Sequence, residues 1–357
     1  MKIAYDAKRY FHNRTGLGNY SRTLVAAVKS RYADIEPVLY DEQPMMRTFS
    51  LGRKAALDGC QLFHGLSNEL PRDVVKAGIP SIVTIHDVAW RTFPKMYSPI
   101  DRIIYDWKYG HSARIATRVI AISESTKRDV MRYYGVSADR IEVIYQPVQQ
   151  DFYTRLSREE AFSMLPERLK SIYCDEARVL LTVGSINSRK NLLGMLKAFH
   201  ALPDTEKIPF VVIGNGREYR RECEKYIAAN NLEPWVYIFD DIHDVNILHA
   251  LYTLSAIMLY PSFYEGFGLP VVEAALQQCP VITSNVSSLP EAAGNGALYV
   301  DPYNVEEMRD AMLQLLRDAD KCRYLGVFGR QYAMSHFHPD VLTRQLYQLY
   351  AGLKIKD

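Results

Sequence analysis

The sequence has no long hydrophobic run. Its 357 residues contain no stretch that approaches the roughly 18 consecutive apolar residues of a membrane-spanning helix. The N-terminal segment, MKIAYDAKRYF, reads as a short strand followed by charge, and it lacks the long apolar core of a signal peptide. These absences argue against a membrane-spanning or secreted protein, and we expect a cytoplasmic one.

Cysteine is scarce, and its spacing excludes two classes of small scaffold. The number of cysteines is odd and no pair has Cys-x-x-Cys spacing, so neither a disulfide framework nor a zinc site is expected. We expect them to be small buried apolar residues. They stand at positions 60, 174, 223, 279 and 322. No Asp-x-Asp motif or His/Asp cluster is well placed for a metal, the nearest being the stretch 240–244, DDIHD.

Length and composition are those of a soluble globular protein with more than one core. The chain is 48% hydrophobic and 24% charged, and its length favours two domains. The net charge of +2 conceals an asymmetry, because residues 1–160 carry +6 and residues 161–357 carry −4. A basic first half suits contact with an anionic molecule.

Short apolar runs alternate with helical patterns along the whole chain. This alternation is typical of parallel sheets covered by helices, so the sequence predicts an α/β protein with two doubly wound Rossmann-like domains facing a cleft. We expect the domains at 1–165 and 166–338, separated near a polar helix at 157–172, with an amphipathic helix at 339–357 that packs back on the first domain. The expected strands are 2–5, 62–63, 81–85, 118–122 and 142–145, and then 179–183, 210–213, 236–239, 256–259, 280–283 and 297–300.

The stretch PSFYEGFGLPVVEA, residues 261–274, places two glutamates around an otherwise apolar turn. It follows an expected strand, and a helix is expected to begin near Pro270. Its glycines allow the backbone to approach a ligand, and the N-terminus of the helix favours an anion. Glu273 at the end of the first helical turn is explained either by the helix dipole or by ligand binding. Glu265 lies beside this anion site, which indicates a partner with hydroxyl groups.

Other expected strands end in glycine turns or polar side chains. Gly184 leads to Arg189 and Lys190 at a helix entrance, where two cations can neutralise phosphate charge or form a solvated basic pair. The turns at Gly16–Gly18 and at Gly214 are weak signals alone, since each lacks the third glycine of a dinucleotide fingerprint. His86 and Asp87 follow another strand, and they serve either a cleft or a simple cap.

Together these segments resemble the retaining glycosyltransferases of family 4, group 1, with the two-domain GT-B fold, and within them mannosyltransferases. The resemblance rests on the glycine turn at 16–18, TIHD, AISEST, VGSINSRKN, IGNG, the E-x7-E motif at 265–273 and SSLPEAAGNGALYVDP. It implies an acceptor-side first domain and a second domain that binds a nucleotide sugar without a metal or other cofactor. The implied catalytic residues are His86, Arg189, Lys190 and Glu265. The implied donor-binding residues are Gly16, Gly18, Gly184, Gly214, Phe267, Gly268, Leu269 and Glu273.

The resemblance favours GDP-mannose as the donor, with UDP-glucose or another UDP-sugar as the alternative. The acceptor implied is a glycan or lipid-linked glycan in surface polysaccharide synthesis, and no nucleic acid is expected to bind. Basic and aromatic residues alternate in the segment 90–118, which suits either a peripheral contact with the inner face of the membrane or a half-buried helix with a solvated face. Two alternatives come from other functional classes. One is a nicotinamide oxidoreductase, which the incomplete glycine fingerprint disfavours, and the other is a non-catalytic sugar-nucleotide-binding protein.

Overall fold

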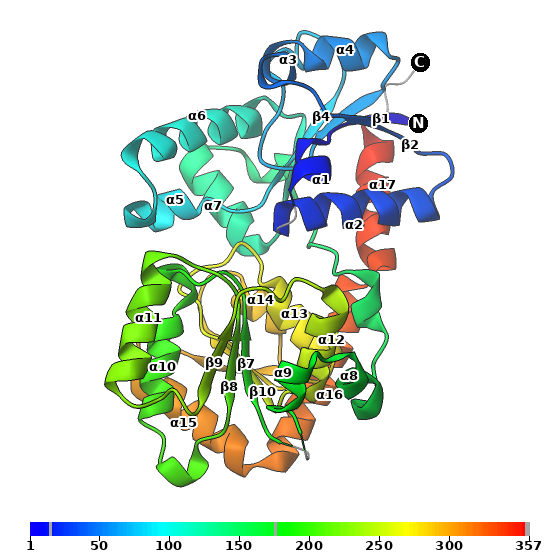
Figure 1. Cartoon of the computed structure of the whole chain (residues 1–357). Coiled ribbons are helices and arrows are strands. Elements are labelled where there is room, and N and C mark those ends of the chain that lie inside the picture. Colours follow the sequence, from blue (N-terminus) through cyan, green and yellow to red (C-terminus); the bar gives the residue numbers. More distant parts are fainter. Residues whose placement is uncertain (14–15, 175–176, 354–357) are drawn as a thin grey trace. The chain divides into compact units, whose positions relative to one another are not determined.

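The computed structural model describes residues 1–13, 16–174 and 177–353, which form two compact units (Figure 1). The first unit contains residues 1–148 and the segment that begins at 337, and the second contains residues 149–336. Each unit is built on one parallel sheet of six strands, as the alternating pattern predicts. Among the described residues, no helix is both long enough and apolar enough to cross a membrane.

The first sheet has the strand order β2-β1-β3-β4-β5-β6. The direction in which strands are added reverses between β1 and β3, which makes this edge the switch point where ligands of such sheets bind. The strands are β1 (Lys2–Asp6), β2 (Glu36–Tyr40), β3 (Leu62–Gly65), β4 (Ser81–Ile85), β5 (Arg118–Ala121) and β6 (Ile141–Val143). The helices are α1 (Lys8–His12), α2 (Gly16–Arg31), α3 (Pro44–Phe49), α4 (Leu51–Leu57), α5 (Ala89–Thr92), α6 (Pro99–Ile115), α7 (Glu124–Tyr134) and α17 (Pro339–Gly352).

The second sheet has the strand order β12-β11-β10-β7-β8-β9, so its switch point lies between β7 and β10. The strands are β7 (Leu180–Val183), β8 (Phe210–Ile213), β9 (Val236–Phe239), β10 (Ile257–Tyr260), β11 (Val281–Ser284) and β12 (Ala297–Val300). The helices are α8 (Arg158–Met164), α9 (Glu167–Lys170), α10 (Leu192–His200), α11 (Glu218–Ala229), α12 (Val245–Leu254), α13 (Leu269–Leu276), α14 (Leu289–Ala293), α15 (Val305–Arg317) and α16 (Ala319–Phe337).

The polar segment 157–172 is two short helices, where we expected one. Ser157 and Glu160 form a reciprocal capping box that starts α8. Pro166 then ends the helix, since the residue before a proline is disfavoured in helical conformation, and Leu165 is extended with ψ of 140°. α9 begins after this break.

Residues 149–165 belong to the second unit, whereas the sequence analysis assigned them to the first domain. Buried polar contacts fix them there. The carbonyl of Phe152 accepts a hydrogen bond of 2.6 Å from Gln277, the C-cap of α13. The carbonyl of Tyr153 accepts one of 3.0 Å from Arg330 in α16. The unit boundary therefore lies earlier than the expected one at 165/166.

The C-terminal helix α17 packs in the first unit, beside α2 (Figure 1, red). Leu346 and Tyr350 are fully buried in one core cluster with Ile3, Tyr5 and Leu24. The hydroxyl of Tyr350 lies 2.7 Å from Nδ1 of His64 and 3.1 Å from the hydroxyl of Tyr5. The helix expected at 339–357 thus ends at 352, and positions 354–357 are outside the described residues.

The cysteines only partly follow expectation. Cys60, Cys223 and Cys279 are buried free thiols, but Cys174 is exposed and Cys322 is half-buried. Cys174 follows the buried Tyr173 in the connection between α9 and β7.

Candidate functional site

The loops after β7 and β10 meet at the switch point of the second sheet. Gly184 follows β7 with φ of 142°, and Gly214 follows β8 with φ of 154°, both in the region that favours glycine. A Cβ atom on Gly214 would lie 1.9 Å from the carbonyl oxygen of Gly184. Only glycine lets these two turns touch. The glycines that the sequence analysis noted at these turns are therefore explained by contact of the backbone with itself. A cavity beside them is lined by Gly184, Lys190 and Tyr260.

Asn191 fixes the conformation of the loop that carries Arg189 and Lys190, the two expected cations. Its φ of 61° is left-handed, a conformation that asparagine adopts more readily than most residues. The buried amide donates hydrogen bonds of 3.1 Å and 2.8 Å to the carbonyls of Pro261 and Pro302. The backbone N–H of Phe263 donates to the carbonyl of Arg189 at 2.9 Å. The β7 and β10 loops are thus held together independently of any side-chain charge.

Glu265 lies between the two expected cations. Its Oε2 is 2.7 Å from Nη1 of Arg189, and its Oε1 is 2.6 Å from Nζ of Lys190. Burial alone would raise the pKa of this carboxyl, but the charges of Lys190 and Arg189 outweigh burial and lower the pKa to about 2. Glu265 is therefore ionised at neutral pH, and the three residues together carry one net positive charge.

Tyr260 completes this cluster from the end of β10. Its hydroxyl accepts a hydrogen bond from Nζ of Lys190, and the ammonium lies 4.6 Å from the centroid of its ring. Burial raises the pKa of the Tyr260 hydroxyl well above its ordinary value, so the phenol stays neutral. The sequence analysis did not identify Tyr260, although its place as the last residue of a strand at the ligand edge is a signal that could have found it.

Two serines fix the loop between Glu265 and α13. The N–H of Glu265 donates to Oγ of Ser287 at 3.0 Å. Oγ of Ser288 lies 2.8 Å from the carbonyls of both Glu265 and Phe267. These serines belong to the segment SSLPEA, which contributed to the family resemblance but received no role. They hold Glu265 and Phe267 in one conformation before the helix begins.

Gly268 is the N-cap of α13, with φ of 112°. A Cβ atom there would lie 2.8 Å from Leu289, so both conformation and space require glycine. Leu269 and Pro270 form the first helical positions, and proline is tolerated there because the first N–H groups of a helix have no intrahelical acceptor. The loop that holds Glu265 thus leads directly into the first turn of α13.

Glu273 lies beyond the first turn of α13, so the dipole explanation considered for it is wrong. The hydroxyl of Tyr252 donates to its Oε2 at 2.9 Å. Burial raises the pKa of the Glu273 carboxyl to about 7, whereas the bond from Tyr252 acts in the opposite direction. Glu265 and Glu273 therefore have separate partners and opposite pKa shifts, and they do not share a proton.

His86 lies in the first unit, directly after β4, and is almost fully buried. One ring nitrogen, Nε2, donates to the carbonyl of Leu66 at 2.8 Å, which leaves Nδ1 to accept from the amide of Gln146 at 2.7 Å. The ring also makes an edge contact with Tyr20 at 4.6 Å between centroids. Burial lowers the pKa of His86, so the imidazole is neutral and fixed in one tautomer.

Gly16 and Gly18 are inside α2, whereas the sequence predicted a turn before the helix. A Cβ atom on Gly18 would lie 1.8 Å from the carbonyl oxygen of Asn13, while Gly16 has open space around it. Glycine is thus required at position 18 because the chain's own backbone leaves no room for a side chain. Thr15, in the same expected turn, is outside the described residues.

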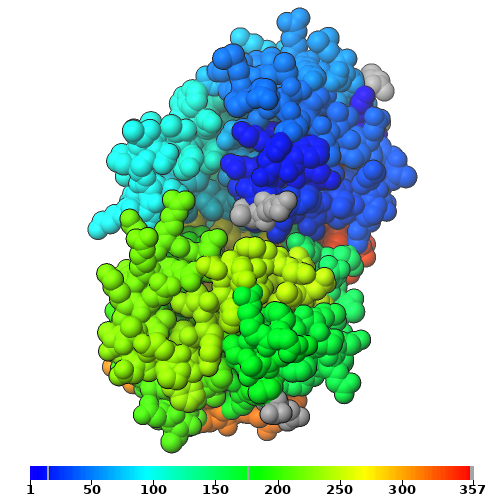
Figure 2. Space-filling view, in the orientation of Figure 1, coloured from blue at the N-terminus to red at the C-terminus, as the bar shows by residue number. Residues whose placement is uncertain are grey.

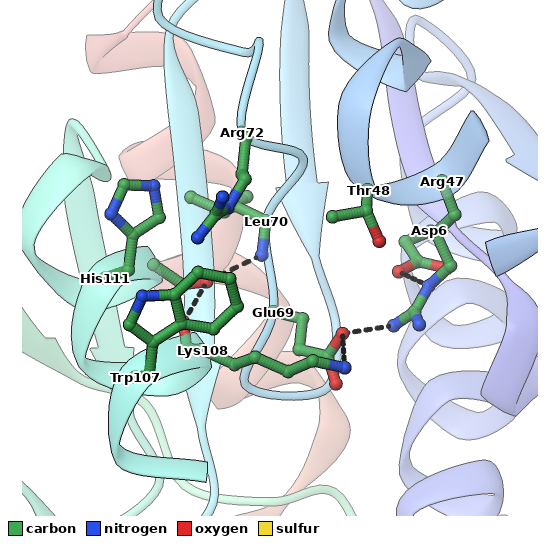
Figure 3. Close-up of a pocket in the computed structure, with 10 residues that line it drawn as sticks. Asp6, Arg47, Thr48, Glu69, Leu70, Arg72, Trp107, Lys108 and His111 are labelled. Carbon is green, nitrogen blue, oxygen red and sulfur yellow. Dashed lines mark hydrogen bonds and ion pairs between the residues drawn. The ribbon is translucent and has the colours of Figure 1, made fainter. Parts of the chain in front are cut away.

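A polar pocket lies at the switch point of the first sheet (Figure 3). Arg47 pairs with Asp6 at the end of β1 and with Glu69, whose carboxylate is 3.1 Å away. On the opposite wall, the guanidinium of Arg72 stacks over the indole of Trp107, 3.7 Å from its centroid. The sequence analysis gave these residues no role, because Asp6, Arg47 and Glu69 come from three separate segments.

The acidic stretch 240–244 has structural partners. Asp240 pairs with Arg220, Asp241 pairs with Arg168, and Asp244 caps α12 through a 2.8 Å bond from Asn246. Across residues 1–13, 16–174 and 177–353, no three His, Cys, Asp or Glu side chains gather as a group that could hold a metal. Metal independence stays a prediction.

Two family models match the chain. One, described as glycosyl transferases group 1, matches residues 169–332, and the other, described as glycosyltransferase family 4, matches residues 47–152. The O-antigen chain mannosyltransferase B of Escherichia coli is 31% identical over 260 residues, which are 72% of this chain and 65% of that protein. The O-antigen chain mannosyltransferase RfbU of Salmonella typhimurium is 25% identical over 241 residues, 64% of this chain and 62% of that protein. The chain thus spans slightly less than two thirds of these relatives.

Solved structures match nearly the whole chain. Anabaena Alr3699/HepE, solved in complex with UDP and glucose, has a TM-score of 0.74 and 17% identity, with 98% of this chain and 99% of that one covered. WaaG, a glycosyltransferase involved in lipopolysaccharide biosynthesis, has a TM-score of 0.71 and 16% identity, with 96% and 98% covered. At these identities the likeness shows a shared fold.

Proposed function

The chain belongs to the group 1 glycosyltransferases of family 4, which have the GT-B fold, and on that premise we propose that it transfers a hexose from a nucleotide diphosphate sugar to a hydroxyl of a glycan acceptor. The observation that carries the proposal is the cluster of Glu265 with Arg189 and Lys190, beside the N-terminus of α13 at the switch point of the second sheet. This cluster supplies both a carboxylate for sugar hydroxyls and an excess positive charge for phosphate.

The diphosphate is the part of the donor that this charge suits. During transfer the bond between the anomeric carbon and the diphosphate oxygen breaks, and negative charge develops on the leaving group. Arg189 and Lys190 are already fixed by Glu265, so they can stabilise that charge without reorganising. Gly184 and Gly214, whose turns touch beside this cluster, are assigned to donor binding. The N–H groups of Phe267, Gly268 and Leu269 at the start of α13 suit an anion.

Glu265 is assigned to the hydroxyl groups of the donor sugar. A carboxylate with a pKa of about 2 is a poor general acid, and two ion pairs make it a poor nucleophile. We therefore propose retention of configuration without a covalent intermediate on Glu265. The acceptor oxygen bonds to the anomeric carbon on the face that the diphosphate leaves, and the acceptor proton departs with the diphosphate. The two cations of the cluster make the step independent of a metal.

Glu273 is assigned to the nucleotide ribose. It is partly exposed on the same helix that begins at the phosphate site, and Tyr252 fixes its orientation. A carboxylate accepts hydrogen bonds from a pair of vicinal hydroxyls, which is the chemistry of a ribose edge. Its raised pKa means that the ligand-free site is partly protonated at neutral pH.

The first unit is assigned to the acceptor, and within it His86, Gly16 and Gly18 are the residues that we propose to contact substrate. The neutral, oriented imidazole of His86 contributes a polar edge that does not change charge near pH 7. The pocket of Arg47, Glu69 and Arg72 lies at the ligand edge of the same sheet, where an acceptor glycan fits the general rule for such folds.

GDP-mannose is the proposed donor, and the product is a surface polysaccharide or its lipid-linked precursor. The support is the sequence similarity to O-antigen mannosyltransferases, the first of them at 31% identity. A UDP-sugar is the alternative, because the structurally similar HepE was solved with UDP and glucose. The alternative from another functional class is a non-catalytic sugar-nucleotide-binding protein, which would bind the donor without turning it over.

Thermal unfolding with GDP, UDP, ADP and dTDP, each alone and as its sugar conjugate, tests the donor. We expect GDP and GDP-mannose to raise the melting temperature most. Release of GDP from GDP-mannose, slow without acceptor and faster with mannan oligosaccharides, then separates an enzyme from a binding protein. An NMR signal for the α-linked product tests retention, and EDTA should leave the rate unchanged. No shift with any nucleotide contradicts the proposal.

A further inference from the structure

Every polar group of His86 has a partner within the first unit. Its backbone N–H donates to Oδ1 of Asn68 at 2.8 Å, and its carbonyl accepts from Oγ1 of Thr126 at 3.3 Å. In the ring, Nε2 donates to the carbonyl of Leu66 and Nδ1 accepts from the amide of Gln146. Only 4% of the residue is exposed. A substrate that forms a hydrogen bond with the ring must therefore replace one of these partners.

The four partners differ in how firmly the fold holds them. Asn68 follows β3, and its backbone N–H donates to a carbonyl of β4 at 2.9 Å. Leu66 is fully buried in a core cluster of the first unit. Thr126 lies in the first turn of α7. Gln146, by contrast, belongs to residues 144–149, which form neither helix nor strand. Its side chain is thus the partner that can leave with the least disruption of regular structure.

The segment that carries Gln146 is one of the two connections between the units. The first unit is continuous as far as Val148, and the second begins at Gln149. β4, which leads to His86, is buried along its whole length, beneath the blue and cyan segments that form the visible surface of the first unit (Figure 2). The hydrogen bond of 2.7 Å between Gln146 and Nδ1 therefore joins a buried, fixed ring to the connecting chain.

Nδ1 is the ring atom of His86 that can accept a hydrogen bond. The carbonyl of Leu66 can only accept, so Nε2 must carry the proton and donate. Tyr20 contacts the ring in an edge arrangement, and its hydroxyl is bonded to Thr84 at 3.1 Å. Burial lowers the pKa of His86, although the bond to Leu66 and the charge of Asp87 act in the opposite direction. The ring is therefore neutral near pH 7 and keeps the lone pair of Nδ1.

We propose that Gln146 is a positioning residue for sugar transfer, which holds the Nδ1 acceptor of His86 and yields it to a hydroxyl group of the substrate. An O–H donor from a sugar replaces the amide N–H donor one for one, so the buried ring nitrogen is never left without a partner. The hydroxyl belongs either to the donor sugar or to the acceptor glycan, which offer the same chemistry. The inference rests on the proposed function, in which His86 contacts substrate.

Replacement of Gln146 by methionine tests the exchange, because methionine has a similar length but donates no hydrogen bond from its side chain. The ligand-free variant leaves Nδ1 without its partner, and a bound hydroxyl restores one. Calorimetry near neutral pH should therefore show binding that is tighter by about fivefold or more for the ligand that carries this hydroxyl. A gain for GDP-mannose but not for GDP identifies the donor sugar, and a gain for mannan oligosaccharides in the presence of GDP identifies the acceptor.

Gln150→Met is the matched control, since it changes an exposed glutamine four positions along the chain and should alter neither affinity. In a His86→Phe background, Gln146→Met should give no gain, because the two residues act through one bond. A purely structural role for Gln146 would instead weaken binding or leave it unchanged. Equal or weaker binding of both ligands by the folded Gln146→Met variant, or the same gain without His86, would overturn the inference.

The wild type offers a test that needs no variant. In protein labelled with nitrogen-15, the coupling across the hydrogen bond between Nδ1 of His86 and the amide of Gln146 should be present without ligand and vanish when the ligand is bound. Persistence of this coupling in the complex contradicts the exchange. Binding of GDP by the same samples tests the proposed function by itself, so failure of the exchange and failure of the transferase proposal are distinguishable.

Discussion

Nζ of Lys190 lies 2.6 Å from Oε1 of Glu265, although the two residues come from loops after different strands. The pair stands at the switch point of the second sheet, where β7 and β10 are neighbours. If Glu265 binds the donor sugar and Lys190 binds the diphosphate, the two parts of the donor would contact the two members of one ion pair. In the proposed function, this ion pair would link sugar recognition to the stabilisation of the leaving group.

Replacement of Lys190 by alanine should mainly slow turnover. The ammonium is assigned to charge that grows on the diphosphate, and loss of one such group typically costs about a hundredfold or more in kcat. Steady-state kinetics with GDP-mannose measures this, and KM for the donor should change much less. Lys197→Ala, on the exposed face of α10, is the control. An unchanged kcat for Lys190→Ala would remove the assigned role.

Replacement of Glu265 by glutamine should reduce both turnover and stability. The pKa of Glu265 in the folded protein, about 2, is below the ordinary value of 4.5. Ionised Glu265 therefore stabilises the fold at pH values above the pKa of the unfolded chain. This stabilisation is lost as the pH falls through the pKa of the folded protein. The loss in the variant should reach about 3 kcal/mol and be constant from about pH 6 to pH 8. Urea unfolding of the wild type, the variant and the exposed control Glu233→Gln measures it. A loss that varies over this range contradicts the assignment.

Glu273 should give the opposite dependence on pH. Its folded pKa of about 7 is above the ordinary 4.5, so the folded chain keeps a proton that the unfolded chain releases. Stability should therefore decline as pH rises from about 4.5 to 7, by at most about 3 kcal/mol. Melting temperatures of the ligand-free protein at the two ends of this window measure the decline, and Glu273→Gln should remove most of it.

Nucleotide binding should release a proton from the same residue. Ribose hydroxyls are better bound by the ionised carboxylate, so binding lowers the pKa of Glu273. Calorimetric titration with GDP near pH 7, in buffers of different ionisation enthalpy, reports the number of protons released. The Glu273→Gln variant should bind GDP more weakly and release fewer protons. Equal release by the variant would assign the proton to another group.

Tyr350→Phe should destabilise the first unit by about 1 to 3 kcal/mol, because it leaves a buried nitrogen of His64 without its partner. Burial lowers the pKa of His64 to about 3, so a new positive charge cannot compensate near neutral pH. Hydrogen exchange of β1 and β3 localises the effect. Tyr347→Phe, which removes an exposed hydroxyl bond to Asp34, is the control and should change stability much less.

Most strands could be predicted from the sequence because apolar runs between turn residues mark buried parallel strands. The strand expected at 81–85 has the same bounds in the structure. β2 was not predicted, since Glu36–Tyr40 is short, contains a proline and is only partly buried. α16 was not predicted, because Gly326 and Gly329 interrupt its pattern. A Cβ atom on Gly326 would lie 2.4 Å from the carbonyl oxygen of Gln278, so packing against the rest of the unit explains that glycine.

At the candidate site, the sequence predicted Glu265, Arg189 and Lys190 but not their mutual contact. The ion pairs depend on the order of β7 and β10 in the sheet, which residue spacing does not encode. Ser287 and Ser288 were missed for the same reason, since they reach the loop from beyond β11. The pKa shift of Glu273 depends on burial around one carboxylate, which no local pattern reports.

The return of α17 to the first unit has a consequence for the order of folding during synthesis. The second unit is one continuous stretch, residues 149–336, so all of its core is available before α17 leaves the ribosome. The first unit, although synthesised first, keeps Ile3, Tyr5 and Leu24 uncovered until Leu346 and Tyr350 arrive. The half of the protein that is made first is therefore finished last, and one of its apolar core clusters stays uncovered until α17 has been synthesised.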